Sequence, residues 1–240
     1  TDWQQVAVAV AALKRFTVIT GGPGTGKTTT VAKILSVWEE LHRGLPARTL
    51  LAAPTGKAAA RLKESLRQRP DRPAPADGGG TGPPCEVHTL HRLLRPVRGT
   101  PLFQHNAENP LPVDLMIVDE ISMIDLALMA KLLDALPPAA RLVLIGDRDQ
   151  LASVEAGSVL SDICGRPHRP GFSPDFGDLV RSATGQPVPI AGGGRPLQDC
   201  IVELQTSHRF SAGSGIGALS RAVNQGDTSA AMAVLSALVA

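Results

Sequence analysis

The chain has 240 residues, 24 of them Lys or Arg and 22 Asp or Glu, which gives a formal net charge of +2. It contains no apolar run near the roughly 20 residues that span a bilayer, and its three cysteines have neither the number nor the spacing of a disulfide framework or a metal site. Composition therefore excludes a membrane-spanning or disulfide-stabilised protein. It predicts a cytoplasmic protein with one large α/β domain, and the weak charge says little about nucleic acid.

The first predicted elements surround a glycine-rich loop. Residues 3–13 have the spacing of an amphipathic helix, and residues 16–20 form an apolar run typical of a buried strand. A second helix is predicted over residues 27–42, with an apolar face made by Val31, Ile34, Leu35 and Trp38. The loop at residues 21–28 therefore lies between a strand and a helix.

This loop reads Gly-Gly-Pro-Gly-Thr-Gly-Lys-Thr, a complete G-x-x-x-x-G-K-[ST] phosphate-binding motif. Its glycines let successive N–H groups turn toward phosphate oxygens, and the helix N-terminus adds partial positive charge. We expect Lys27 to reach the β- and γ-phosphates and the Thr28 hydroxyl to ligate Mg²⁺. The candidate nucleotide contacts in the loop are Gly22, Pro23, Gly24, Thr25, Gly26, Lys27, Thr28 and Thr29.

Strand and helix signals continue to alternate after the loop. Residues 49–53 read as a second buried strand, and an Ala-rich helix is predicted over residues 57–68. Residues 70–85 are rich in Gly and Pro and predict a flexible surface insertion. A short helix is predicted over residues 87–94, and a strongly apolar strand over residues 114–118.

The second half repeats this alternation. Helical spacing over residues 124–136 ends at a Pro-Pro pair, and residues 141–145 form the next strand. Residues 165–197 carry many Gly and Pro and predict a long irregular insertion before a last strand at residues 200–204. The pattern from Ser211 onward is helical. The alternation predicts an α/β fold in which helices cover both faces of a parallel sheet.

Two polar residues follow the strand at residues 114–118. In a phosphate-loop fold, Asp119 at that position can hold Mg²⁺, and Glu120 can orient or deprotonate an attacking water. The alternative is an acidic pair that caps the next turn, a role that Ser122 or Asp125 could also fill.

A second polar segment, residues 146–151, follows the next strand at the same sheet edge. Gln150 in this segment can hydrogen-bond a γ-phosphate or the attacking water. A Gly-Asp turn would explain the segment equally well by itself.

Taken together, these segments resemble the motifs of superfamily 1 DNA helicases, and among them the RecD family. The resemblance spans nearly the whole chain, and six motifs occur in the right order. Motifs I, Ia, Ib, II, III and IV are matched by residues 21–30, 53–62, 87–94, 118–123, 146–151 and 207–210. Residues 2–7 resemble the adenine-reading Q motif, in which Gln4 is the best match and Gln5 the alternative.

The resemblance implies a RecA-like phosphate-loop core that acts as an ATP-dependent DNA helicase, moving 5′→3′ on single strands. It implies ATP and Mg²⁺ as cofactors, with Mg²⁺ on Thr28 and Asp119. The implied catalytic residues are Lys27, Asp119, Glu120, Gln150 and Arg209, the last facing the γ-phosphate from a second motor domain. The implied DNA contacts are Thr55, Lys57, His88 and Thr89, with a solvated basic helix face as the alternative for Lys57 and Arg61.

The resemblance also implies partners and a domain plan. The partners are single-stranded DNA, duplex DNA ends, and the RecB and RecC subunits of exodeoxyribonuclease V, which repairs double-strand breaks by recombination. Later motifs of the second motor domain do not appear before Ala240. We therefore expect residues 1–205 to form the first motor domain and residues 206–240 to begin a truncated second one.

Three other functions stay open on the sequence. One is a stand-alone RecD-like helicase, and another is a phosphate-loop kinase or switch ATPase that does not act on DNA. The third is a nucleotide-binding module that does not turn nucleotide over in isolation.

Overall fold

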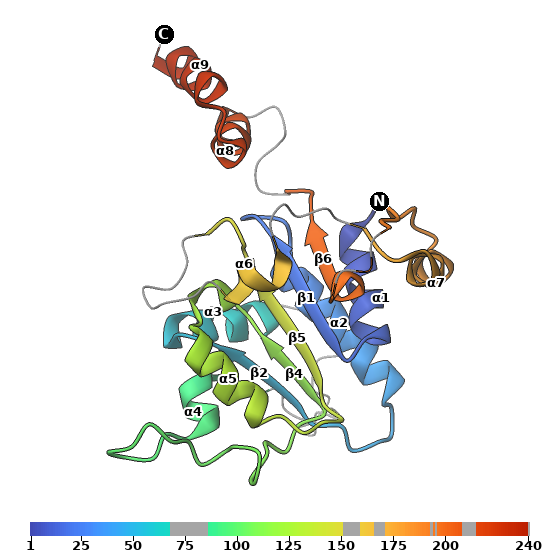
Figure 1. The fold of residues 1–240 in the computed structure, drawn as a ribbon, viewed down its shortest axis with the longest axis vertical. Coiled ribbons are helices and arrows are strands. Elements are labelled where there is room, and N and C mark those ends of the chain that lie inside the picture. Colours follow the sequence, from blue (N-terminus) through green and yellow to red (C-terminus); the bar gives the residue numbers. More distant parts are fainter. Residues whose placement is uncertain are drawn as a thin grey trace.

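The structure, a computed structural model, describes residues 1–67, 86–150, 159–165, 171–192, 194, 196–207 and 215–239 (Figure 1). Within these residues, six strands form one parallel sheet in the order β3-β2-β4-β5-β1-β6. The strands are β1 (Phe16–Gly21), β2 (Thr49–Ala53), β3 (Glu86–Thr89), β4 (Leu115–Val118), β5 (Arg141–Gly146) and β6 (Ile201–Leu204). The predicted parallel α/β fold is confirmed.

Side chains of the central strands alternate between two separate hydrophobic cores. Ile117 and Ile145 point into one core, whereas Met116 and Leu144 point into the other. Successive residues of a strand face opposite sides of a sheet, and both sides here are covered by helices. This is why the strands read as continuous apolar runs in the sequence.

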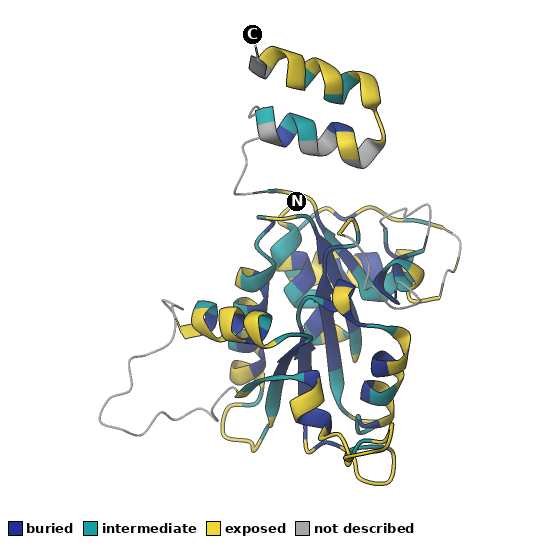
Figure 2. Ribbon diagram, turned by 90° about the vertical axis from the view of Figure 1, so that its left-hand side faces the viewer, coloured by how far each residue is buried: buried dark blue, intermediate teal, exposed yellow. Residues whose placement is uncertain are grey.

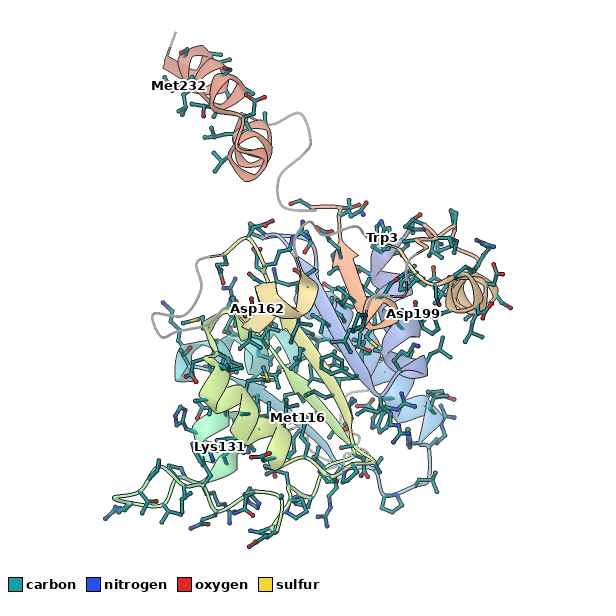
Figure 3. The ribbon with its side chains drawn as sticks, in the orientation of Figure 1. Trp3, Met116, Lys131, Asp162, Asp199 and Met232 are labelled. Carbon is teal, nitrogen blue, oxygen red and sulfur yellow. The ribbon has the colours of Figure 1, made fainter. Side chains whose placement is uncertain are left out.

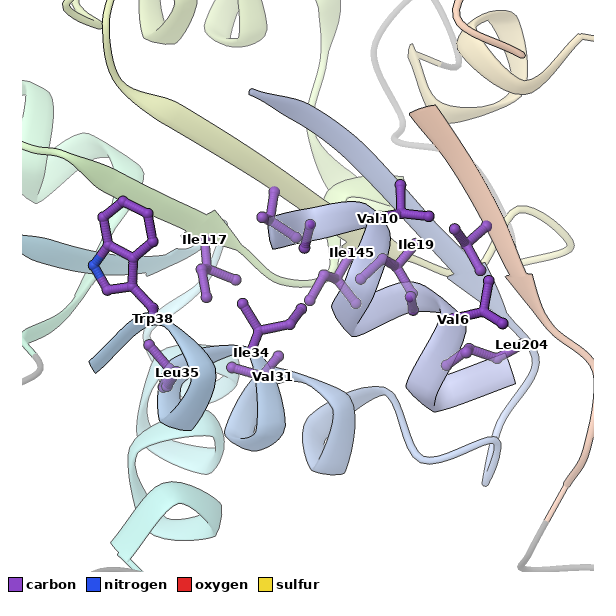
Figure 4. Packing of buried hydrophobic residues seen from close by; sticks show 14 of the residues in the cluster. Val6, Val10, Ile19, Val31, Ile34, Leu35, Trp38, Ile117, Ile145 and Leu204 are labelled. Carbon is purple, nitrogen blue, oxygen red and sulfur yellow. The ribbon is translucent and has the colours of Figure 1, made fainter. Parts of the chain in front are cut away.

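Four helices cover the first face. They are α1 (Trp3–Leu13), α2 (Lys27–Leu41), α3 (Gly56–Arg67) and α7 (Pro174–Thr184). Figure 4 shows the apolar face of α2 packed beneath the sheet beside Ile19 and Ile145, as its sequence spacing predicts. All four residues of that predicted face are buried, namely Val31, Ile34, Leu35 and Trp38.

Three shorter helices cover the second face, α4 (Leu90–Leu94), α5 (Leu126–Asp134) and α6 (Val159–Cys164). Figure 2 shows that burial is concentrated in the strands and on the inner helix faces. In Figure 3, Met116 lies inside this body, where it is fully buried, whereas Met232 lies on α9 outside it and is 57% exposed.

The predicted helix over residues 87–94 is wrong in its first half. Residues Glu86–Thr89 form the edge strand β3, which pairs with β2 so that Thr89 lies opposite Ala53. The helix α4 begins only afterwards, where the Thr89 hydroxyl accepts a hydrogen bond from the Arg92 N–H at 3.3 Å. An edge strand needs little apolar alternation, so its polar sequence resembled a helix start.

The helix predicted over residues 124–136 is shorter and has a turn before it. A 3₁₀ turn, η2 (Ile121–Met123), comes first, and α5 then begins at Leu126. Asp125 is the N-cap, because its carboxylate accepts a hydrogen bond from the Leu128 N–H at 2.7 Å.

The insertion predicted over residues 165–197 is not irregular throughout. It contains α7, whose Phe176 and Val180 enter the same core as α1. Within the turn η3 (Gln198–Cys200), Asp199 accepts hydrogen bonds from both the N–H and the hydroxyl of Ser173 at 2.7 Å. The other predicted insertion, residues 70–85, lies outside the described residues.

The last described elements are α8 (Gly215–Gln225) and α9 (Thr228–Val239), which pack against each other. Figure 1 shows this helical pair beyond the sheet edge where β6 ends. In the described part of the chain, no helix has the length and apolar character needed to cross a membrane.

Candidate nucleotide site

The phosphate loop connects β1 to α2 through left-handed glycine conformations. Gly24 and Gly26 have φ angles of 78° and 84°, which residues with a Cβ rarely adopt. A Cβ on Gly26 would also lie 2.2 Å from the Gln4 side-chain nitrogen. The Thr25 hydroxyl closes the loop by donating to the Gly22 carbonyl at 2.9 Å. The loop is therefore built from glycine where the motif requires it.

Lys27 lies at the first turn of α2 with its side chain folded into the loop. Its ammonium donates to the carbonyl oxygens of Gly21 at 2.5 Å and Gly22 at 3.1 Å. These carbonyls hold a positive charge at the helix N-terminus, where anions bind favourably. The Lys27 ammonium therefore lies inside the loop.

The loop forms one wall of a cavity of about 1150 Å³, more than the roughly 300–1,000 Å³ usual for small-molecule sites. Five separate parts of the chain contribute: α1, the phosphate loop, the start of α3, and the segments that follow β4 and β5. The sequence-predicted residues that line it are Gln4, Pro23, Gly24, Thr25, Gly26, Lys27, Thr28, Thr29, Thr55, Lys57, Asp119, Glu120 and Gln150. Of the others, Gly22 contributes its carbonyl to Lys27, His88 and Thr89 do not line the cavity, and Arg209 lies outside the described residues.

The acidic pair after β4 lines this cavity, and Glu120 is the N-cap residue of η2, although its side chain makes no capping hydrogen bond. The Asp119 N–H donates to the Ala52 carbonyl at 2.9 Å, and the Glu120 N–H donates to the Asp119 carboxylate at 2.9 Å. Burial raises the pKa of the Asp119 carboxyl to about 6, against the opposing effects of the Glu120 N–H and the charge of Lys27. The side chain that caps α5 is that of Asp125.

Glu120 has a φ of 54°, in the left-handed region that residues other than glycine rarely occupy. Such a conformation costs on the order of 1–3 kcal/mol and persists only where the surroundings enforce it. Here the strained residue joins β4 to η2 and lies at the cavity wall. Strain of this kind is typical of functional sites.

Gln150 comes from the turn after β5. Its N–H donates to the Asp147 carbonyl at 3.3 Å, and its side-chain carbonyl accepts a hydrogen bond from the Ser122 hydroxyl at 2.9 Å. Asp147 is buried at the base of this turn, and its carboxylate accepts from the Asp149 N–H at 3.1 Å. The Gly-Asp turn is therefore present, and it carries Gln150 to the cavity.

The structure separates the two candidates for the adenine-reading glutamine. The Gln4 side chain lies on the phosphate loop, where its amide NH₂ group donates to the Thr25 carbonyl at 3.2 Å. Its side-chain carbonyl accepts a hydrogen bond from the Lys33 ammonium at 3.1 Å. The Gln5 side chain instead accepts a hydrogen bond from Gln186 at 3.1 Å. Only Gln4 of these two lines the cavity.

The four DNA-contact candidates divide into two pairs. Thr55 and Lys57 lie on the cavity wall, and the Thr55 hydroxyl accepts from the Ala58 N–H at 3.2 Å at the start of α3. His88 and Thr89 lie on β3, where His88 contacts Glu86 at 2.9 Å and Thr89 caps α4.

Two further polar residues of α3 line this wall, Arg61 and Ser65. Sequence reasoning considered Arg61 only as part of a basic helix face with Lys57, and it missed Ser65. Both residues follow Lys57 at intervals of four residues on α3, so they share its helix face. The helical spacing was a signal that could have identified them.

The chain is similar in sequence to known proteins. A family model for the AAA domain matches residues 4–156. The RecBCD enzyme subunit RecD of Haemophilus influenzae is 43% identical over 230 residues, which are 94% of this chain and 36% of that protein. The ATP-dependent RecD2 DNA helicase of Deinococcus radiodurans is 47% identical over 143 residues, 60% of this chain and 17% of that protein. The chain thus spans little more than a third of the RecD relative's length.

Among solved structures, Bacteroides Pif1 bound to ssDNA has the same fold. The two chains align with a TM-score of 0.52 at 24% identity, over 99% of this chain and 49% of the other.

Proposed function

Because this chain belongs to the AAA domain family, and within it to the RecD family of superfamily 1 helicases, we propose that it is the first motor domain of an ATP-dependent 5′→3′ DNA helicase. The observation that supports this most is the cavity where Lys27, the acidic pair and Gln150 meet. These groups come from three neighbouring strands, β1, β4 and β5, and only the fold brings them together.

The residues present fit ATP with Mg²⁺. Thr28 and Asp119 offer oxygen ligands, and Mg²⁺ usually takes one or two protein oxygens together with phosphate oxygens and water. The pKa of Asp119 is raised because burial removes water from its carboxylate, and a bound cation would stabilise the charged carboxylate in place of that water. When bound, Mg²⁺ would neutralise charge on the phosphates.

Each remaining residue then has a role in hydrolysis. Lys27 holds the β- and γ-phosphates, Glu120 orients or deprotonates the attacking water, and Gln150 contacts the γ-phosphate. Gln4, the residue that lies on the loop, reads the adenine base.

We propose Arg209 as the γ-phosphate contact from the second motor domain, which would begin near residue 206. Support comes from the described residue nearest to it in the chain. The Ser207 hydroxyl donates to the Pro23 carbonyl of the phosphate loop at 3.2 Å. Ser207, two residues before Arg209, therefore contacts the phosphate loop.

The DNA contacts remain proposals. Thr55 and Lys57 offer a hydroxyl and an ammonium, and His88 and Thr89 lie one strand further out, on the edge of the sheet. Such groups hold phosphates of any sequence, as a translocating motor requires. Binding of a single-stranded oligonucleotide should therefore weaken steeply with added salt.

The similarity to the RecD relative supports a proposal about partners. Its name places it in the RecBCD enzyme, so we propose RecB and RecC as partners, duplex DNA ends as substrate and the cytoplasm as location. A stand-alone helicase is the second candidate, because the RecD2 helicase is also similar. Co-purification of this chain with RecB and RecC supports the first candidate, and failure to bind them favours the second.

The deciding experiment compares this chain with its Lys27→Ala variant. ATP hydrolysis is measured with and without single-stranded DNA, and thermal unfolding with and without Mg-ATP. Saturating Mg-ATP should stabilise the parent by about 2.7 kcal/mol at 100 times its Kd, and the variant not at all. DNA-stimulated turnover supports the motor, and a thermal shift without turnover supports a nucleotide-binding module. A variant that behaves like the parent contradicts the assignment of the site.

A further inference from the structure

Ser122 is a buried hydroxyl on a rigid support. It is 7% exposed and lies in η2, directly after the acidic pair. The neighbouring Ile121 is fully buried and packs so closely on Gly146 that a Cβ there would lie 2.9 Å from the Ile121 side chain. The position of Ser122 is therefore fixed by the core and by the end of β5.

Gln150 has the opposite character. Its side chain is exposed on a turn, and a long exposed side chain samples many rotamers unless something holds it. The bond that holds it here is the 2.9 Å hydrogen bond from the Ser122 hydroxyl to its side-chain carbonyl. A buried group thus anchors an exposed one.

The direction of this bond decides which end of the amide is available. The side-chain carbonyl of Gln150 accepts the hydrogen bond from Ser122, and within the described residues its side-chain NH₂ group has no hydrogen-bond partner. Gln150 lines the cavity and Ser122 does not, so the anchored end lies on the protein side. The amide NH₂ group can only donate hydrogen bonds, and the oxygens of an ionised phosphate can only accept them. The arrangement therefore favours donation of a hydrogen bond to a phosphate oxygen over acceptance of a hydrogen bond from the attacking water.

We propose that Ser122 is a positioning residue that fixes Gln150 as a hydrogen-bond donor to the γ-phosphate. The hydroxyl also joins the segment that carries Asp119 and Glu120 to the turn that carries Gln150, so the two segments respond to the nucleotide as one unit. This inference rests on the proposed function, because it assumes a nucleotide in the cavity.

Equilibrium binding to this chain tests the inference without any need for turnover. The Kd is measured for Mg-ADP and for a non-hydrolysable Mg-ATP analogue, and their ratio reports recognition of the γ-phosphate. Ser122→Ala should reduce the preference for the analogue about 2- to 12-fold, the cost of fixing a freely rotating side chain. Its Kd for ADP should not change. Gln150→Ala should reduce the preference about 10- to 100-fold, since it removes a hydrogen bond to a charged group.

Three further variants make the test specific. Ser122→Thr keeps a hydroxyl and should restore the preference, and Ser122→Ala should add nothing to Gln150→Ala. Ser36→Ala is the matched control, because Ser36 donates to the Ala32 carbonyl within α2 at 3.2 Å.

The inference is overturned if Ser122→Ala keeps the parent's preference, or if it weakens ADP and the analogue equally. A parent chain with no preference for the analogue overturns it as well. Failure of the proposed function has a different signature, namely unchanged binding of both nucleotides by Lys27→Ala.

Discussion

The two halves of one sheet edge use similar polar residues for different purposes. At the ends of β1, β4 and β5, the side chains of Lys27, Glu120 and Gln150 line a cavity. At the ends of β2 and β3, the hydroxyls of Thr55 and Thr89 accept hydrogen bonds from the first turns of α3 and α4, and of these two only Thr55 also lines the cavity. A side chain that caps a helix has part of its hydrogen-bonding capacity committed to the fold. We therefore expect the reactive groups of this edge to be the side chains of Lys27, Glu120 and Gln150 rather than the capping hydroxyls.

The strongest test of this difference compares Glu120, at the cavity, with Glu86, the first residue of β3, which lies away from this sheet edge. Glu120→Gln should lower ATP turnover about 10²- to 10⁴-fold, because the amide cannot accept a proton from water. Mg-nucleotide binding should persist, as measured by titration. The matched change Glu86→Gln, at the edge strand β3, should leave turnover within about twofold in the same assay, since Glu86 contacts only His88 among the described residues. Equal losses of ATP turnover in both variants would contradict a specific role for Glu120 in the cavity.

A second prediction concerns the pH dependence of stability. The pKa of Asp119 is raised from 3.8 to about 6, so the folded chain binds this proton more tightly than the unfolded chain does. The contribution of Asp119 to the free energy of unfolding should therefore fall as pH rises from about 4 to 6, by roughly 3 kcal/mol in total.

Urea unfolding of the parent and of Asp119→Asn across pH 4 to 7 measures this difference. The parent should lose stability relative to the variant over that window and not above it. Added Mg-nucleotide should restore the parent's stability at pH 7 and have less effect on the variant. Parallel pH profiles would mean that Asp119 is not desolvated.

The smallest effect that we expect is on stability, at the end of β3, where Thr89 caps α4. Thr89→Ala removes the N-cap of α4 and should lower the free energy of unfolding by about 1 kcal/mol. Thr89→Ser should recover most of that loss, because it retains the hydroxyl oxygen. Nucleotide affinity should be the same in all three chains, and a change in it would place Thr89 in the nucleotide site after all.

Sequence reasoning was most accurate where local pattern and chemistry coincide. The phosphate loop, the five apolar strands and the face of α2 that includes Trp38 all follow from short-range spacing, and the structure has them. Edge strand β3 could not be distinguished from a helix, because its only strand neighbour among the described residues is β2 and its sequence is polar. Helix α7 was hidden by the Gly and Pro residues around it, although Phe176 and Val180 have helical spacing.

The position of the α3 residues was harder to predict, for a different reason. Whether Lys57 and Arg61 face the nucleotide cavity or the solvent depends on the direction in which α3 leaves β2, which is a tertiary property. No local pattern encodes that direction. The same holds for Ser122 and Gln150, whose contact joins positions 28 residues apart.

The pairing of β6 with β1 gives the molecule a path for mechanical load. The two strands run parallel, with register pairs from Val18–Ile201 to Gly21–Leu204, and β1 ends in the phosphate loop while β6 leads out of the domain (Figure 1). Tension on the chain beyond Ser207 pulls along β6, so the main-chain hydrogen bonds are loaded in shear and share the force rather than opening one by one. A force on the chain that leaves β6 would therefore be transmitted through β1 to the phosphate loop.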